Sequence, residues 1–254
     1  MIIIKNRNEI DTMRRAGEIV AAAIEAARLM VKPGVTTEEL DHIAAREIDG
    51  RGAQPSFLGY RGFPATICTS VNQEIVHGIP GPKKLREGDL VKLDVGAIVD
   101  GFHADSAVTI PVGEPAPEAL KLIETTERAL WAGLAEAQVG RRLGDIGAAV
   151  QTVAEGAGFS VVREYVGHGV GRSLHEEPPV PNYGHSGKGY KLTEGLVIAI
   201  EPMVNVGGYA TRLLDDGWTV VTEDGSLSAH FEHTVAVTPD GPWVLTDPEG
   251  RLAS

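Results

Sequence analysis

Two aspartates near the middle of the chain, Asp94 and Asp105, have a spacing that could support chemistry. Between them lies Asp100-Gly101, a dipeptide typical of type I′ hairpin turns because both of its residues accept positive φ. A two-residue turn here pairs position 94 with position 107, and position 105 shares a face with 107 because side chains alternate along a strand. The sequence therefore predicts two carboxylates close together on one face of a hairpin.

Such a pair has two interpretations. A solvated face is the commoner place for aspartates. The flanking segments 90–93 and 107–110 are largely apolar, however, which is typical of buried strands. Like charges this close destabilise a sheet unless something positive lies between them. We therefore expect a cation at this place.

Three further residues could join the site as ligands. His168 lies in the glycine-rich segment 167–172, Glu201 follows the apolar run 196–200, and Glu232 lies in an apolar segment that reads as a strand. A carboxylate is costly to bury without a partner. A lone histidine between glycines is more often a simple turn residue. Together the candidates are four carboxylates and one imidazole.

Four carboxylates carry too much negative charge for one divalent ion. Two ions about 3.5–4 Å apart match that charge and can share bridging carboxylates. Ligation by many oxygens and one nitrogen favours Mn²⁺, Fe²⁺, Co²⁺ or Zn²⁺ over metals that prefer thiolates. Such a pair of ions generates hydroxide at neutral pH and polarises a carbonyl group, so we expect hydrolysis of an amide or ester.

Helices followed by strands are expected to position these ligands. Apolar residues recur every three or four positions from Ile10 to Val31, which predicts an amphipathic helix that ends before Pro33. Thr36 and Glu39 form a capping box that opens a second helix.

The same plan returns 106 residues later, where Gly140 corresponds to Gly34 and Asp145 to Glu39. We therefore expect one catalytic domain over 1–254 with an internal duplication, its halves roughly 7–112 and 113–240. Helices and strands in separate blocks predict an α+β arrangement with an antiparallel sheet. Beside the hairpin, strands are expected over 65–71, 161–164, 196–200, 219–221 and 230–238.

Composition narrows the class of protein. With 254 residues, 43% hydrophobic and 23% charged, the chain can bury a full core. A net charge of −12 argues against broad capture of nucleic acid, so we expect no DNA partner. The single cysteine, Cys68, excludes an intrachain disulfide and a zinc–thiolate cluster and fits a reducing, cytoplasmic setting. We expect neither a membrane span nor a signal peptide.

The order of the five candidate ligands and the short sequence motifs around them resemble those of the type I methionine aminopeptidases. These motifs are LDVG, HADS, GHGVGR, IEPM and FEHT, and the resemblance runs from about Ile10 to Val237. It implies the pita-bread α+β fold, in which two pseudo-twofold halves pack helices on a curved antiparallel sheet.

The resemblance also implies roles for the ligands. Asp94 would bind one metal ion, His168 with Glu201 the other, and Asp105 with Glu232 would bridge them. The cofactor would be two divalent ions of Co, Mn, Fe, Zn or Ni. The implied reaction removes the initiator methionine when the second residue is small. The implied partners are N-termini of nascent polypeptides and the ribosome, and a monomer is expected.

Further residues match functional positions of this family. His77 resembles the residue that contacts the substrate amide nitrogen, and His175 resembles the one that contacts the scissile carbonyl. The residues that match the pocket for the methionine side chain are Tyr60, Phe63, Cys68 and Trp218. Taken alone, these would be surface loop histidines and ordinary core packing. Leu174 stands where many relatives carry an aromatic residue, and Phe63 stands where tyrosine is frequent.

Two alternatives stay open. Aminopeptidase P and the Xaa-Pro dipeptidases share this fold and these ligands, but they usually carry an additional N-terminal domain for which this chain has no room. They also lack the words VHGIP and DDGWTV that occur here. The other alternative is a non-catalytic pita-bread binding protein, which the presence of all five ligands disfavours.

Overall fold

A large antiparallel sheet holds the molecule together. The computed structural model describes residues 1–252, and within them nine strands form this sheet. They are β1 (Gln54–Pro55), β2 (Ile67–Val71), β4 (Leu90–Val99), β5 (Phe102–Pro111), β7 (Gly167–Gly169), β8 (Glu176–Val180), β9 (Val197–Ile200), β14 (Glu232–Thr238) and β15 (Gly241–Val244). The order is β1-β4-β5-β14-β9-β7-β8, with β2 paired to β4 and β15 paired to β14.

Two smaller sheets flank it. One joins β6 (Ser160–Val161), β10 (Met203–Asn205) and β13 (Ser228–His230). The other joins β3 (Glu74–Val76), β11 (Thr211–Leu213) and β12 (Val220–Thr222). All the strand pairs are antiparallel, which confirms the predicted α+β arrangement.

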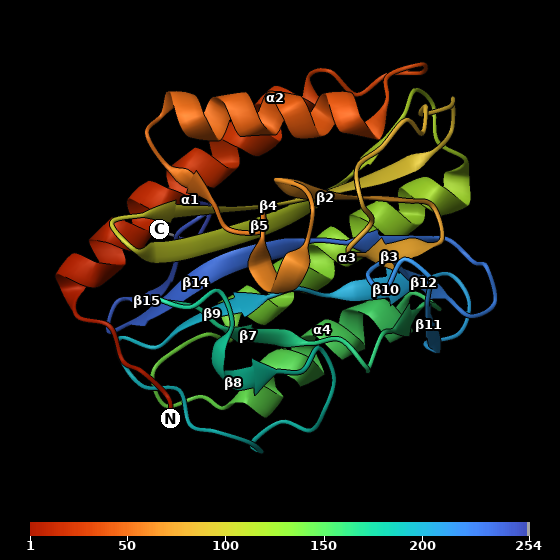
Figure 1. The fold of residues 1–254 in the computed structure, drawn as a ribbon. Coiled ribbons are helices and arrows are strands. Elements are labelled where there is room, and N and C mark those ends of the chain that lie inside the picture. The colour runs from red at the N-terminus through yellow and green to blue at the C-terminus, as the bar shows by residue number, and fades with distance from the viewer. Residues whose placement is uncertain (253–254) are drawn as a thin grey trace.

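Within residues 1–252, four helices cover the sheet. They are α1 (Arg7–Arg28), α2 (Thr37–Gly50), α3 (Pro117–Ala135) and α4 (Leu143–Gly156), and a short 3₁₀ turn η1 spans Tyr60–Gly62. Figure 1 shows the red and orange pair α1 and α2 along the β4–β5 hairpin and the green pair α3 and α4 beside the second half of the chain. Each pair therefore packs mainly on strands of its own half, while the N-terminal part of α1 also contacts second-half residues such as Val197 and Leu245.

The predicted stripe of α1 is confirmed from Ile10 to Ala27, where its apolar residues are buried. The helix ends at Arg28, so Val31 lies beyond it. At Gly17 the helix backbone lies directly against the backbone of Leu245. A Cβ at this position would overlap the carbonyl oxygen of Leu245.

The capping box of α2 is also confirmed. The Glu39 backbone N–H donates to Thr36 Oγ1 at 3.2 Å, and the Thr36 N–H donates to the Glu39 carboxylate at 2.7 Å. Gly34 and Gly140 precede corresponding helices with φ of +93° and +92°, values that favour glycine. This match supports the proposed duplication, whose halves stay a prediction.

Two predicted strands differ from the structure. The strand expected over 161–164 is only Ser160–Val161, because Arg163 and Glu164 turn outward into solvent. The strand expected over 230–238 is two strands in different sheets. The chain changes sheet at Phe231, whose N–H donates to the carbonyl of Pro202, while His230 pairs with Met203.

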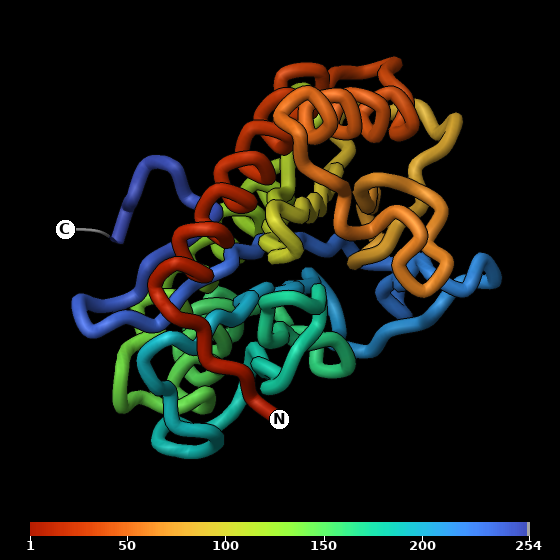
Figure 2. Tube along the Cα trace, turned by 60° about the vertical axis from the view of Figure 1, so that its left-hand side comes forward, coloured from red at the N-terminus to blue at the C-terminus, as the bar shows by residue number. Residues whose placement is uncertain are grey.

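The N-terminal segment is tied to the second half of the chain. Figure 2 shows it, in red, passing from α1 across the green and cyan segments. The Lys5 N–H donates to the carbonyl of Gly195, and the Lys5 ammonium forms a buried 2.6 Å ion pair with Glu176. Among the described residues, no helix has the length and apolar character needed to cross a membrane.

Candidate metal centre

The β4–β5 hairpin has the register that the sequence predicts. Asp100 and Gly101 form its turn with φ of +50° and +77°. Asp94 is paired with Ala107, and Asp105 is paired with Gly96. Side chains alternate along each strand, so Asp105 and Ala107 share a face. The two carboxylates therefore lie diagonally on one face, as predicted.

Strand β14 brings a third carboxylate to this face. Glu232 is paired with Ala107, which is itself paired with Asp94 on the other side. A row across the sheet thus carries carboxylate, methyl and carboxylate. The small side chain of Ala107 leaves the space between the two acids open.

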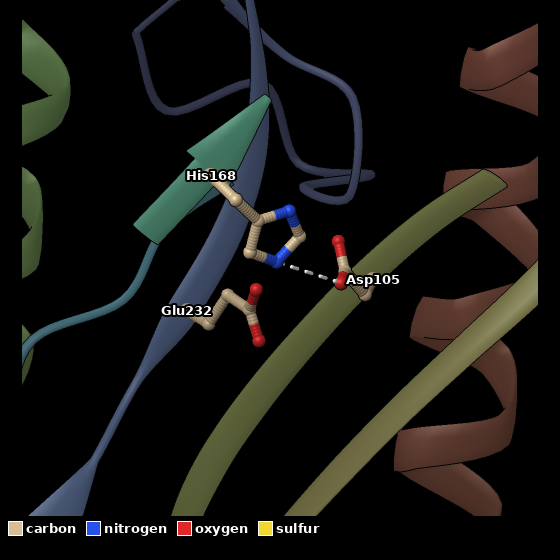
Figure 3. A group of neighbouring side chains, drawn as sticks. All are labelled: Asp105, His168 and Glu232. Atoms are coloured by element: carbon tan, nitrogen blue, oxygen red, sulfur yellow. Dashed lines mark ion pairs between the residues drawn. The ribbon is translucent and has the colours of Figure 1, made fainter. Parts of the chain in front are cut away.

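His168 and Glu201 come from the neighbouring strands. His168 lies on β7, and Glu201 directly follows β9, which pairs with both β7 and β14. His168 Nε2 lies 3.6 Å from Asp105 Oδ2 and 3.5 Å from Glu201 Oε1. Ligand atoms of Asp105, His168 and Glu232 all lie within 4.8 Å of one another. Figure 3 shows these three side chains converging on one point.

Hydrogen bonds with neighbouring groups orient both candidate ligands, His168 and Asp105. His168 Nδ1 lies 2.9 Å from the carbonyl oxygen of Gly169, so the ring proton belongs on Nδ1 and the Nε2 lone pair faces the carboxylates. Thr234 Oγ1 lies 3.0 Å from Asp105 Oδ1 and accepts the Asp105 N–H at 3.1 Å. Such contacts orient metal ligands before an ion arrives.

The electrostatics of the cluster call for a cation. Burial, together with the neighbouring carboxylates, raises the pKa of Asp94, Glu201 and Glu232 well above their usual range. Burial raises the pKa of Asp105 to about 6. Within residues 1–252, no Lys or Arg forms an ion pair with any of the four. These residues therefore fit divalent cations, which supply the missing positive charge.

A cavity of about 160 Å³ opens beside the ligands. All eleven candidate residues from the sequence line it, namely Tyr60, Phe63, Cys68, His77, Asp94, Asp105, His168, His175, Glu201, Trp218 and Glu232. One end of this cavity is thus charged and the other aromatic. Phe57, Arg61 and Leu174 also line it.

The two candidate histidines differ in their surroundings. His175 Nδ1 lies 2.9 Å from the Tyr60 hydroxyl, and its ring lies 4.1 Å from that of His168. His77 has a φ of +61° and packs edge-on against Trp218 at 6.3 Å. Burial lowers the pKa of both histidines to about 4, so both are neutral at pH 7.

The sequence analysis did not identify His230, a fully buried residue whose side chain lies next to that of Glu201. Its Nε2 lies 3.7 Å from Glu201 Oε2. One signal could have found it. In the strand expected over 230–238, His230 lies two residues before Glu232, so both side chains would share the face that carries the candidate ligands.

Comparisons with known proteins agree with this geometry. Residues 11–239 match the model of metallopeptidase family M24. The chain is 53% identical to the methionine aminopeptidase of Clostridium perfringens over 246 residues, which are 97% of this chain and 99% of that one.

Solved structures give the same picture. The crystal structure of methionine aminopeptidase from Rickettsia prowazekii has a TM-score of 0.96 and 44% identity, covering 97% of this chain and all of that one. The prolidase from Pyrococcus furiosus has a TM-score of 0.78 and 25% identity, covering 97% of this chain but 66% of that one.

Proposed function

Since the chain belongs to metallopeptidase family M24, among the methionine aminopeptidases, we propose that the five clustered ligands hold two metal ions for its reaction. It has the pita-bread α+β fold and removes the initiator methionine from protein N-termini. Our proposal concerns which residues do this and which substrates are preferred.

Asp94, Asp105, His168, Glu201 and Glu232 are the proposed ligands, with Asp105 and Glu232 as bridges. Two divalent ions held there would supply hydroxide at neutral pH and polarise a carbonyl group. The central place of Asp105, close to both His168 and Glu232, supports its bridging role. The metal, among Co, Mn, Fe, Zn and Ni, is left to experiment.

His175 is proposed to donate a hydrogen bond to the oxygen of the scissile carbonyl. When the Tyr60 hydroxyl donates to Nδ1, the ring proton of neutral His175 lies on Nε2, the other nitrogen. A donor fixed in this way stabilises the negative charge that develops on the oxygen. His77 is proposed to contact the amide nitrogen and assist proton transfer.

The aromatic end of the cavity is proposed to bind the methionine side chain. Phe63 and Trp218 pack edge to face with ring centroids 5.1 Å apart, and Tyr60 and Cys68 complete this wall. A thioether gains from contact with aromatic rings. The preference for a small second residue, contact with the ribosome, a monomeric state and a cytoplasmic location stay predictions.

The observation that carries the proposal is a group of four carboxylates, two buried and two half-buried, that lines a partly aromatic cavity together with the buried imidazole of His168. The test is release of free methionine from Met-Xaa-Ser peptides that vary in the second residue. Stripped protein is loaded with each of the five metals, and an Xaa-Pro dipeptide serves as the competing substrate. Cleavage of the Xaa-Pro dipeptide in preference to Met-Ala-Ser would contradict the proposed specificity.

A further inference from the structure

The ring of His230 is buried without a hydrogen bond. Its residue is 1% exposed, and neither Nδ1 nor Nε2 has a hydrogen-bond partner. Among the described residues it is the only side chain with two such atoms. A buried polar group left unpaired destabilises the folded state, so this ring needs an explanation.

Glu201 lies between two imidazoles. Its Oε1 is 3.5 Å from His168 Nε2, and its Oε2 is 3.7 Å from His230 Nε2. The second distance is longer than an ordinary N–H···O hydrogen bond, so the contact is that of a dipole facing a carboxylate. A small decrease in the distance between Nε2 and Oε2 would turn this contact into a hydrogen bond.

The backbone holds the His230 ring in this place. The Thr109 hydroxyl donates to the His230 carbonyl at 2.7 Å and accepts its N–H at 2.8 Å. On the other side, His230 pairs with Met203, two residues after Glu201. The ring is therefore anchored beside the segment that carries Glu201, which lies between β9 and β10.

Nε2 of His230 could carry either a lone pair that binds metal or a proton that is donated to Glu201, and the surroundings favour the proton. A metal-binding histidine normally donates its other ring N–H to a nearby acceptor, as His168 does to the Gly169 carbonyl. Nδ1 of His230 has no such acceptor. A proton on Nε2 instead faces the Glu201 carboxylate, whereas a lone pair there would repel it.

We propose that His230 is a positioning residue that donates its Nε2–H to Glu201 Oε2 and so directs Oε1 toward the metal ion held with His168. This inference rests on the proposed function of the ligand cluster. It assigns His230 no contact with substrate and none with metal. Loss of a partner of this kind typically weakens metal binding about 10–100-fold.

The test measures metal binding rather than turnover. His230→Leu removes the donor, whereas His230→Gln keeps an N–H at similar reach. His42→Leu, at an exposed position on α2, is the matched control. Stripped full-length proteins are titrated with Mn²⁺ alone by calorimetry, and the Co²⁺-loaded proteins are compared by visible absorption.

We expect His230→Leu to bind Mn²⁺ about 10–100-fold more weakly than the parent and to shift the Co²⁺ bands. We expect His230→Gln to lie within about 3-fold of the parent, as a retained donor predicts. His42→Leu should match the parent. In a Glu201→Gln background the effect of His230→Leu should disappear, because His230 acts through Glu201.

Several results would overturn the inference. Parent-like affinity and an unchanged Co²⁺ spectrum in His230→Leu would exclude positioning. Loss of one metal equivalent in both His230 variants would make this residue a ligand. If His230→Leu does not fold, as judged by circular dichroism, His230→Asn replaces it, because its shorter amide does not reach Glu201. Unchanged metal binding in Glu232→Gln would instead refute the proposed metal centre itself.

Discussion

In the metal-free protein, replacing Asp105 by asparagine should increase stability although it damages the site. Asp105 is 3% exposed, and burial raises its pKa from the ordinary 3.8 to about 6. At pH 7.5 the ionised carboxylate therefore opposes folding. Asparagine has nearly the same shape, carries no charge and can still accept from Thr234.

The size of the effect follows from the two pKa values. The difference between 3.8 and about 6 corresponds to at most about 3 kcal/mol in the free energy of unfolding. Because the pKa is raised in the folded state, stability is highest when Asp105 is protonated and falls as pH rises from about 4 through about 6. The advantage of Asp105→Asn should therefore be small at pH 4 and fully developed at pH 7.5.

Urea denaturation of chelator-stripped protein at several pH values measures this advantage. A gain of about 3 kcal/mol corresponds to an increase in Tm of about 6–12 °C in a chain of this size. Asp100→Asn is the control, since that side chain is exposed in the hairpin turn and should change stability by less than about 0.5 kcal/mol.

Metal should reverse the order of stability. Mn²⁺ at about 100 times its Kd adds about 2.7 kcal/mol to the parent, and Asp105→Asn should gain far less. A stripped Asp105→Asn protein that is less stable than the parent at pH 7.5 would refute the view that this cluster holds uncompensated charge.

Four further predictions concern activity and packing. Glu232→Ala should lower methionine release by more than about 100-fold, because a lost bridge disturbs both ions; robust turnover would disprove the bridge. His175→Ala should lower kcat by about 10²–10³-fold with unchanged metal content by atomic absorption, and an unchanged rate would remove its carbonyl role. Lys5→Met should destabilise the protein by about 3–5 kcal/mol in urea, because Glu176 is left as a buried unpaired charge; the added change Glu176→Gln should recover most of this loss. Gly17→Ala should lower stability by about 1–3 kcal/mol or more, since the added methyl overlaps a backbone carbonyl, and a neutral result would show that α1 can shift.

Local signals predicted much of the site. The turn residues Asp100 and Gly101 determine the hairpin register, so the relation between Asp94 and Asp105 followed from counting. The capping box at Thr36 likewise marks the start of a helix through contacts within four residues. Such contacts depend only on nearby residues, which is why one sequence suffices to predict them.

Contacts between distant segments could not be predicted in this way. The ion pair of Lys5 with Glu176 joins residues 171 positions apart, and no local sequence pattern predicts it. The change of sheet at Phe231 also has no signal of its own, because the residues on both sides are equally typical of strands. For the same reason the contact of His230 with Glu201 could not be predicted, because it depends on the pairing of β13 with β10.

The pairing of β5 with β14 places the two aspartates from the first half of the chain against His168, Glu201 and Glu232 from the second. Neither half contains all five proposed ligands. During translation the centre therefore cannot exist until Glu232 has been synthesised and has emerged, and its assembly must await a pairing between residues more than a hundred positions apart. A nascent copy of this chain thus lacks the complete proposed centre while most of it is being made, and it cannot process its own N-terminus in that period.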